Sequence, residues 1–134
     1  MNTPSKQSEE AKPIVAITMG DAAGIGPEVI AKALHDPEVK RGCKPLVIGD
    51  ARVFKDLRFA AACDLLPVDD PATLRERTLN ADLDGWILDQ ATLDPASIEV
   101  GRMAAQAGRA AVAAVLKATK LALALAVGIA FPLL

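Results

Sequence analysis

The chain has 134 residues, of which 51% are hydrophobic, and 15 Lys and Arg against 17 Asp and Glu leave a net charge of -2. This length suits one domain, and the apolar content is too high for an intrinsically disordered chain. An acidic chain with only 3% aromatic residues lacks the basic, aromatic surface that nucleic-acid-binding proteins use. We therefore expect one globular domain with no nucleic-acid partner.

The two ends of the sequence differ from its middle. Residues 1–12 are polar and contain no apolar run, which predicts a flexible arm rather than a secretory signal. Residues 121–134 carry no charge, but this run is shorter than the ~20 residues of a membrane-spanning helix and is interrupted by Gly128 and Pro132. A buried strand is the expected structure here, and no membrane partner is expected.

Residues 13–134 alternate between apolar, β-branched runs and stretches in which apolar residues recur at helical spacing. This alternation predicts an α/β fold with a largely parallel sheet flanked by helices, and no linker divides it. Residues 69–81 are polar and receive no assignment. The expected strands are residues 13–19, 45–48, 64–68, 86–88 and 126–131, and the expected helices are residues 27–35, 51–62 and 100–124.

The most informative segment is the loop of residues 20–26 (GDAAGIG), which joins the first strand to the first helix. Pro27 suits the first turn of a helix, and the glycine-rich backbone before it exposes N–H groups at the helix N-terminus. Such a loop can bind a phosphate or carboxylate, and Asp21 adds a carboxylate where α/β sheets bind their ligands. The expected cleft or ligand-loop residues are Gly20, Asp21, Gly24 and Gly26.

Two other interpretations of this loop stay open. Gly24 and Gly26, followed later by Asp50, match part of a dinucleotide-binding fingerprint, although its third glycine would fall at Val29. The loop could equally be a tight turn that binds nothing.

Five other residues invite a functional or a structural interpretation. Arg102 and Arg109 are seven residues apart, so one helix face would carry both, as possible phosphate contacts or as solvated surface arginines. Cys43 and Cys63 are too few for a disulfide scaffold and lack metal-site spacing, which predicts reduced thiols in a cytoplasmic protein. The single histidine, His35, lies at the expected end of the first helix, where the helix dipole favours a cation.

Residues 14–28 (IVAITMGDAAGIGPE) closely resemble the N-terminal signature of the 4-hydroxythreonine-4-phosphate dehydrogenase family, which includes D-threonate and D-erythronate 4-phosphate dehydrogenases. The family signature reads G-D-P-A-G-I-G-P-E, so Ala22 replaces its usual proline. Leu134 stands where the family has asparagine. Residues 46–50, 101–111 and 128–133 are similar to later segments of the family pattern.

The resemblance implies the N-terminal part of an isocitrate/isopropylmalate dehydrogenase-like fold, and well under half of a usual family member. It implies oxidation, with decarboxylation, of a phosphorylated hydroxy acid such as 4-phosphohydroxy-L-threonine or D-threonate or D-erythronate 4-phosphate. The cofactor would be NAD or NADP, and the enzyme would be a cytoplasmic homodimer. Its pathway would be one such as pyridoxine biosynthesis.

The family's divalent metal (Zn, Mg or Co) polarises the reacting oxygen and is held by three histidines that lie beyond residue 134 in the family pattern. No catalytic or metal-binding residue is therefore assigned within this chain, and the chain alone is predicted to be inactive. The alternative function is that of a non-catalytic fragment that self-associates, or binds a partner or a membrane, through its apolar C-terminal run.

Overall fold

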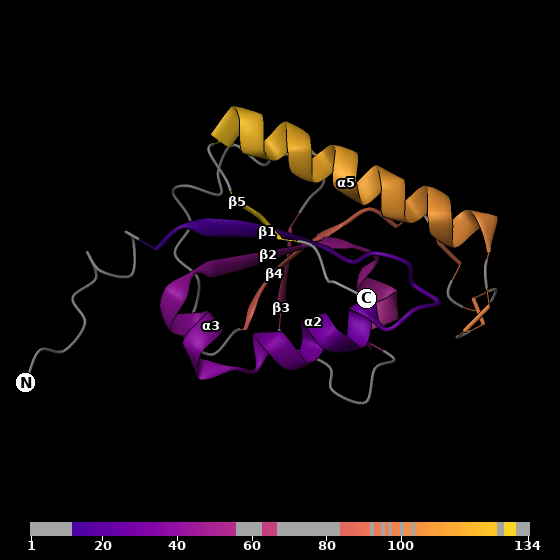
Figure 1. Cartoon of the computed structure of the whole chain (residues 1–134), viewed down its shortest axis with the longest axis horizontal. Coiled ribbons are helices and arrows are strands. Elements are labelled where there is room, and N and C mark those ends of the chain that lie inside the picture. The colour runs from indigo at the N-terminus through magenta and orange to yellow at the C-terminus, as the bar shows by residue number, and fades with distance from the viewer. Residues whose placement is uncertain are drawn as a thin grey trace, which may run out of the picture.

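A five-stranded parallel sheet with the strand order β3-β4-β2-β1-β5 forms the centre of the described part of the molecule (Figure 1). The structure is a computed structural model that describes residues 12–55, 63–66, 84–91, 93–94, 96, 98–99, 101–102, 104–125 and 128–130. The strands are β1 (Ile14–Thr18), β2 (Lys44–Gly49), β3 (Cys63–Leu66), β4 (Gly85–Asp89) and β5 (Gly128–Ala130). The helices are α2 (Gly26–Leu34), α3 (Pro37–Gly42), α4 (Ala51–Lys55) and α5 (Ala105–Leu125).

Helices cover both faces of this sheet, with α5 on one side and α2 and α3 on the other (Figure 1). Successive side chains of a strand point to opposite faces, so the central strands contribute to two separate cores. The core under α5 contains Ala16, Leu46, Ile48, Trp86, Leu88, Ala114, Ala118 and Leu121. The core under α2 and α4 contains Met19, Ala22, Ile30, Leu34, Val47, Ala51, Phe54, Ile87 and Leu93, and Ala110 of α5 also belongs to this cluster.

The centre of the sheet is β2, all six residues of which are buried. A strand buried on both faces reads as a continuous apolar run, which is why the segment around Leu46 to Ile48 shows no alternation of polar residues. The last residue of this strand is Gly49. Glycine fits at this position because a Cβ atom there would lie 2.6 Å from the Cβ atom of Met19, which is too close. The Met19 side chain therefore occupies, at the carboxyl edge, the space that a side chain at position 49 would need.

Most of the expected elements are confirmed, with shifted ends. The five expected strands correspond to β1 to β5, and Pro27 lies in the first turn of α2 as expected. The last helix begins at Ala105 rather than at residue 100. The sequence does not predict helix α3, because the pattern of apolar residues stops at Asp36-Pro37. In the structure Asp36 caps α3, and its side chain accepts a hydrogen bond from the Glu38 N–H at 2.9 Å.

Several expectations lie outside the described residues. These are the polar arm apart from its last residue, the second half of the helix expected over residues 51–62, the unassigned segment 69–81, and residues 131–134 of the apolar C-terminal run. Among the helices that the structure does describe, none has both the length and the apolarity needed to cross a bilayer.

Candidate functional site

The glycine-rich loop lies at the carboxyl end of β1, between Thr18 and the first residue of α2. Its start is fixed to the sheet, because the Met19 N–H donates a hydrogen bond to the Ile48 carbonyl at 3.0 Å. The next residue, Gly20, has φ 73°, a left-handed conformation that glycine adopts without the strain a Cβ atom would cause. The loop therefore leaves the sheet through a turn that requires glycine at this position.

Asp21 holds the middle of the loop in a compact turn. Its Oδ1 atom accepts a hydrogen bond from the Ala23 N–H at 2.8 Å, and its carbonyl accepts one from the Gly24 N–H at 3.0 Å. Asp21 and Gly24 are both exposed, whereas Ala22 and Ala23 are buried. The turn thus presents a carboxylate and a glycine backbone to the solvent, on a support of buried alanines.

The same loop leads directly into the N-terminus of α2. No side chain caps this end: Ile25 is the N-cap residue and makes no side-chain hydrogen bond. The first N–H groups of a helix have no partner within the helix, and they form the positive end of its dipole. Glu28 lies in this first turn and pairs with Lys32 at 3.3 Å, so one carboxylate of the chain itself already lies near the positive end.

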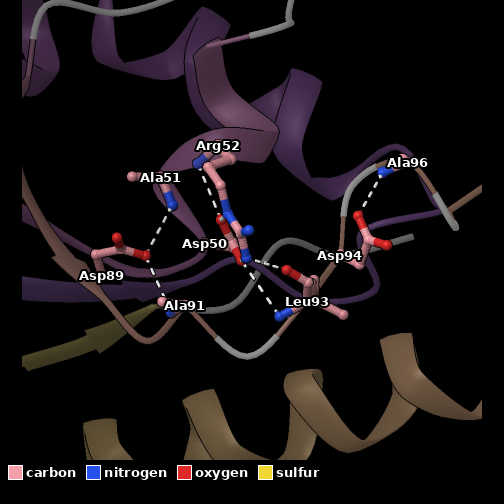
Figure 2. A network of polar contacts seen from close by, with 8 residues as sticks. All are labelled: Asp50, Ala51, Arg52, Asp89, Ala91, Leu93, Asp94 and Ala96. Atoms are coloured by element: carbon pink, nitrogen blue, oxygen red, sulfur yellow. Dashed lines mark hydrogen bonds and ion pairs between the residues drawn. The ribbon is translucent and has the colours of Figure 1, made fainter.

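A second cluster of polar groups lies where β2 ends (Figure 2). Asp50 follows β2 directly and is 1% exposed. Its Oδ1 atom accepts hydrogen bonds from Arg52 N at 2.9 Å and Nε at 3.2 Å. Its Oδ2 atom accepts from Arg52 Nη2 at 2.9 Å and from Leu93 N at 3.3 Å, and Arg52 Nη2 also donates to the Leu93 carbonyl. Both oxygens of Asp50 are therefore engaged by the protein.

These contacts shift the pKa values of both members of the pair. Burial alone would raise the pKa of Asp50, but the hydrogen bonds from Arg52 and Leu93 outweigh it and lower that pKa below its usual value. The hydrogen bond to Asp50 raises the pKa of Arg52 further. The arginine is about half exposed, so Asp50 and Arg52 form a fixed ion pair in which only the arginine reaches solvent.

Asp89 connects the ends of two neighbouring strands (Figure 2). It is the last residue of β4, and its Oδ1 atom accepts hydrogen bonds from Ala51 N at 3.2 Å and from Ala91 N at 3.0 Å. The first contact reaches the start of α4, and the second stabilises the turn after β4, where Ala91 has φ 47°. Asp50 and Asp89 thus hold together the two loops that follow β2 and β4.

The structure brings the predicted ligand-loop residues together. Gly20, Asp21 and Gly24 lie in the loop, and Gly26 is the first residue of α2. The Gly101 N–H donates a hydrogen bond to the Ala23 carbonyl at 2.7 Å, so the segment before α5 lies beside the loop.

The expectation that Arg102 and Arg109 share one helix face is wrong. Because α5 begins at Ala105, Arg102 precedes the helix, and it pairs with Glu99 at 2.9 Å in a largely exposed contact. Arg109 lies on α5 and is exposed. Their role as phosphate contacts stays a prediction.

Sequence reasoning missed Arg52 and Asp89 as members of the carboxyl-edge cluster. A signal for both existed, since an aspartate ends or follows two strands, at Gly49-Asp50 and at Leu88-Asp89. The carboxyl ends of parallel strands lie at one edge, so these two aspartates could have been expected to meet. The position of His35 as the C-cap residue of α2 is confirmed, but its neighbour Asp84, 3.8 Å from its Nδ1 atom, was not foreseen.

The dinucleotide-binding interpretation requires a free carboxylate at Asp50 to accept hydrogen bonds from a ribose. Four protein donors already occupy the two oxygens of Asp50, and its side chain is buried. This geometry counts against that interpretation of the loop. Cys43 is a free thiol, and burial raises its pKa. The side chain of Cys63 lies outside the described residues, so the expectation of two reduced thiols stays a prediction.

Comparison with known proteins finds relatives that are named as dehydrogenases. No family model matches it. A protein of Symbiobacterium thermophilum, provisionally named a D-threonate 4-phosphate dehydrogenase, is 39% identical over 116 residues, which are 85% of this chain and 33% of that protein. The 4-hydroxythreonine-4-phosphate dehydrogenase of Trichlorobacter lovleyi is 46% identical over 76 residues, which are 54% of this chain and 20% of the enzyme.

Solved structures give the same result. The crystal structure of the 4-hydroxythreonine-4-phosphate dehydrogenase from Klebsiella pneumoniae matches 90% of this chain with a TM-score of 0.72 and 34% identity, and the chain covers 37% of that structure. The enzyme from Burkholderia phymatum matches 90% of the chain with a TM-score of 0.70 and 30% identity. The chain spans about a third or less of the length of its curated relatives. Over most of its length, this chain is therefore similar in sequence and in fold to part of the 4-hydroxythreonine-4-phosphate and D-threonate 4-phosphate dehydrogenases.

Proposed function

We propose that this chain provides part of a dehydrogenase that oxidises a phosphorylated hydroxy acid with NAD or NADP, with loss of CO2 from the product. The observation that carries the proposal is the 39% identity over 85% of the chain to a relative whose name states this kind of substrate. The names of both curated relatives contain a 4-phosphate on a small hydroxylated acid. Substrates such as 4-phosphohydroxy-L-threonine or D-threonate or D-erythronate 4-phosphate are thus the first choice. A cytoplasmic homodimer is part of the same proposal.

Within this enzyme, the loop of residues 20–26 would lie beside an anionic group of the substrate or cofactor. Three features support this role: the loop is at the carboxyl edge of the sheet, Gly24 is exposed, and the uncapped N-terminus of α2 follows. Asp21 would orient a hydroxyl group, because Oδ1 is engaged by the Ala23 N–H and no described group donates to Oδ2. Arg102, next to the residue that is bonded to the loop, would add positive charge.

The described residues do not fit a divalent metal. They contain no group of three or more His, Cys, Asp or Glu side chains that could hold one. The single histidine of the sequence lies beside Asp84, at the opposite edge of the sheet from the loop. No metal-dependent step is therefore assigned to these side chains, and the Zn, Mg or Co site of such an enzyme would draw its ligands from other residues.

The first experiment tests the chain by itself. The purified 134-residue protein is mixed with 4-phosphohydroxy-L-threonine or D-threonate 4-phosphate, NAD or NADP, and Zn²⁺, Mg²⁺ or Co²⁺. We expect no increase in absorbance of the reduced nicotinamide, because the described residues contain no group of three or more His, Cys, Asp or Glu side chains that could hold a metal. A metal-dependent increase would place the catalytic groups within this chain and contradict our assignment of no catalytic residue to it.

The second experiment tests whether the chain can serve as part of the enzyme. The matched segment of the Trichlorobacter lovleyi dehydrogenase is replaced by the corresponding segment of this chain, and we expect the chimera to oxidise its substrate. Gly24→Val should reduce activity at least about tenfold without unfolding the chimera. Gly24 is exposed, and its nearest neighbour beyond the adjacent residues, the Asp21 carbonyl oxygen, would lie 3.4 Å from a new Cβ atom. A folded chimera without activity would contradict the proposed function.

A further inference from the structure

The outer side of α5 carries an apolar stripe that no described part of the chain covers. Ala107, Ala110, Ala114, Ala118 and Leu121 face the sheet and are buried. On the other side, Val112 is 60% exposed, Leu116 58% and Leu123 84%. Figure 1 shows α5 as the outermost layer on its side of the sheet. We define the α5 stripe as Val112, Leu116, Thr119 and Leu123.

The spacing within the α5 stripe is that of a helix–helix contact. Val112, Leu116, Thr119 and Leu123 follow one another at intervals of four, three and four residues. This alternation of three and four keeps a narrow row of side chains on one line of a helix, and such a row fits into the groove of a second helix. Val115, which is 37% exposed, widens the row on one side. A single scattered apolar side chain on a surface needs no explanation, but a row at this spacing indicates a contact surface.

The charge around the stripe indicates what kind of helix would fit. Helix α5 contains three basic residues, Arg109, Lys117 and Lys120, and no acidic residue. Arg109 and Lys120 are exposed and flank the stripe on one side. A second copy of α5 would bring like charges together, which opposes association. A helix with acidic side chains beside its own apolar row would instead place opposite charges along the contact.

We propose that the α5 stripe is a docking surface for an acidic amphipathic helix, in which apolar side chains pack on Val112, Leu116 and Leu123 while carboxylates face Arg109 and Lys120. The occupant is defined by this chemistry: an α-helix with apolar residues at alternating intervals of three and four, bordered by Glu or Asp. Recognition would follow the helix-in-groove mode, with the apolar row giving most of the affinity and the charges giving orientation and specificity. The α5 stripe lies on the outer side of α5, and the inference does not depend on the dehydrogenase activity.

The test uses the full chain and two synthetic helical peptides of the same length and apolar row, one bordered by Glu and the other by Lys. We expect the Glu peptide to bind at least about tenfold more tightly than the Lys peptide in fluorescence titration, with a difference that shrinks at high salt. Equal affinities, or no binding of the Glu peptide, would overturn the proposal.

Three variants locate the binding surface. Leu116→Gln should weaken binding of the Glu peptide at least about fivefold, since it removes a central apolar side chain. Lys120→Glu should narrow the difference between the two peptides. Val29→Gln is the matched control, because Val29 is exposed on α2, on the opposite side of the sheet, and this variant should bind like the parent. Circular dichroism verifies that each variant is folded.

The same samples also test two other occupants of the α5 stripe, a second copy of the chain and a membrane. If the chain associates with itself and Leu116→Gln abolishes this association, the stripe binds a second copy, and the proposal is wrong. If the chain binds vesicles of phosphatidylcholine and phosphatidylserine through Leu116 but does not bind the Glu peptide, the stripe is a membrane surface, and the proposal is again wrong.

Discussion

A buried aspartate lies at each end of the parallel strands, Asp50 at the carboxyl edge and Asp84 at the amino edge of the sheet. The partners of the two carboxylates come from different parts of the sequence. At the carboxyl edge, Asp50 receives four hydrogen bonds, three of them from a residue only two positions away in the sequence. At the amino edge, Asp84 meets Lys40 of α3 and His35 at the end of α2, which come from distant parts of the sequence. A carboxylate bound by its neighbours in the sequence is oriented as soon as the local turn forms. One bound by distant partners depends on the packing of separate helices.

Removal of Asp50 from the cluster at the carboxyl edge should cost more stability than any other change proposed here. Asp50→Ala should lower the free energy of unfolding by about 3 kcal/mol, because it removes a charged acceptor and leaves the N–H group of the buried Leu93 without a partner. Urea unfolding followed by circular dichroism measures the change. An effect below about 1 kcal/mol would show that the loops after β2 and β4 do not depend on this carboxylate.

The corresponding change at the amino edge should cost less. Asp84→Ala is expected to lower the free energy of unfolding by about 1.5 kcal/mol, about half of the Asp50→Ala effect. Asp84 is 6% exposed, but the side chains of Lys40 and His35 are 41% and 49% exposed and regain water when their partner is lost. The same urea titration compares the two variants. An equal or larger loss for Asp84→Ala would mean that the contacts between helices, rather than the local turn, dominate.

The pH dependence of stability should show a smaller difference, between the parent protein and a variant without the Asp50 carboxylate. The pKa of Asp50 is lower in the folded protein than in the unfolded chain, so the folded state gains stability from ionised Asp50 above the unfolded pKa of about 4. This contribution disappears as the pH falls through the lowered folded pKa. The stability of the parent should therefore decrease between about pH 5 and the folded pKa more steeply than that of Asp50→Asn, which cannot ionise. Parallel curves for the two proteins would contradict the lowered pKa.

The order of elements was predictable from the sequence because the signals are local. Pro27 after a glycine-rich loop indicates the start of a helix, and the uninterrupted apolar run around Leu46 to Ile48 indicates a central strand. The strand order could not be derived in this way, since the pairing of β1 with both β2 and β5 depends on contacts between distant segments. The sequence predicts too early a start for α5, because Gly101, which has φ 84°, lies in a turn and does not continue a helix.

In the candidate site, too, local features were predictable from the sequence and contacts between distant segments were not. The loop of residues 20–26 was identified from its glycines, and its position at the carboxyl edge is confirmed by the end of β1 at Thr18. Leu93, one of the two partners of Asp50, could not be identified from the sequence, because this contact crosses from one loop to another. The separation of seven residues between Arg102 and Arg109 equals about two helical turns, which predicts that both lie on one helix. This prediction is wrong because α5 begins only at Ala105.

The pairing of β1 with β5 has a consequence for how the protein folds during synthesis. Val15 lies opposite Gly128, so nearly the whole chain separates two strands that are neighbours in the sheet. Closing such a long loop is entropically costly, and parallel sheets with distant partners form slowly. While the chain is still emerging from the ribosome, β1 can pair with β2 on one side, but its other edge has to wait for β5. A chaperone that covers this open edge should therefore raise the yield of folded protein, most clearly at high rates of expression.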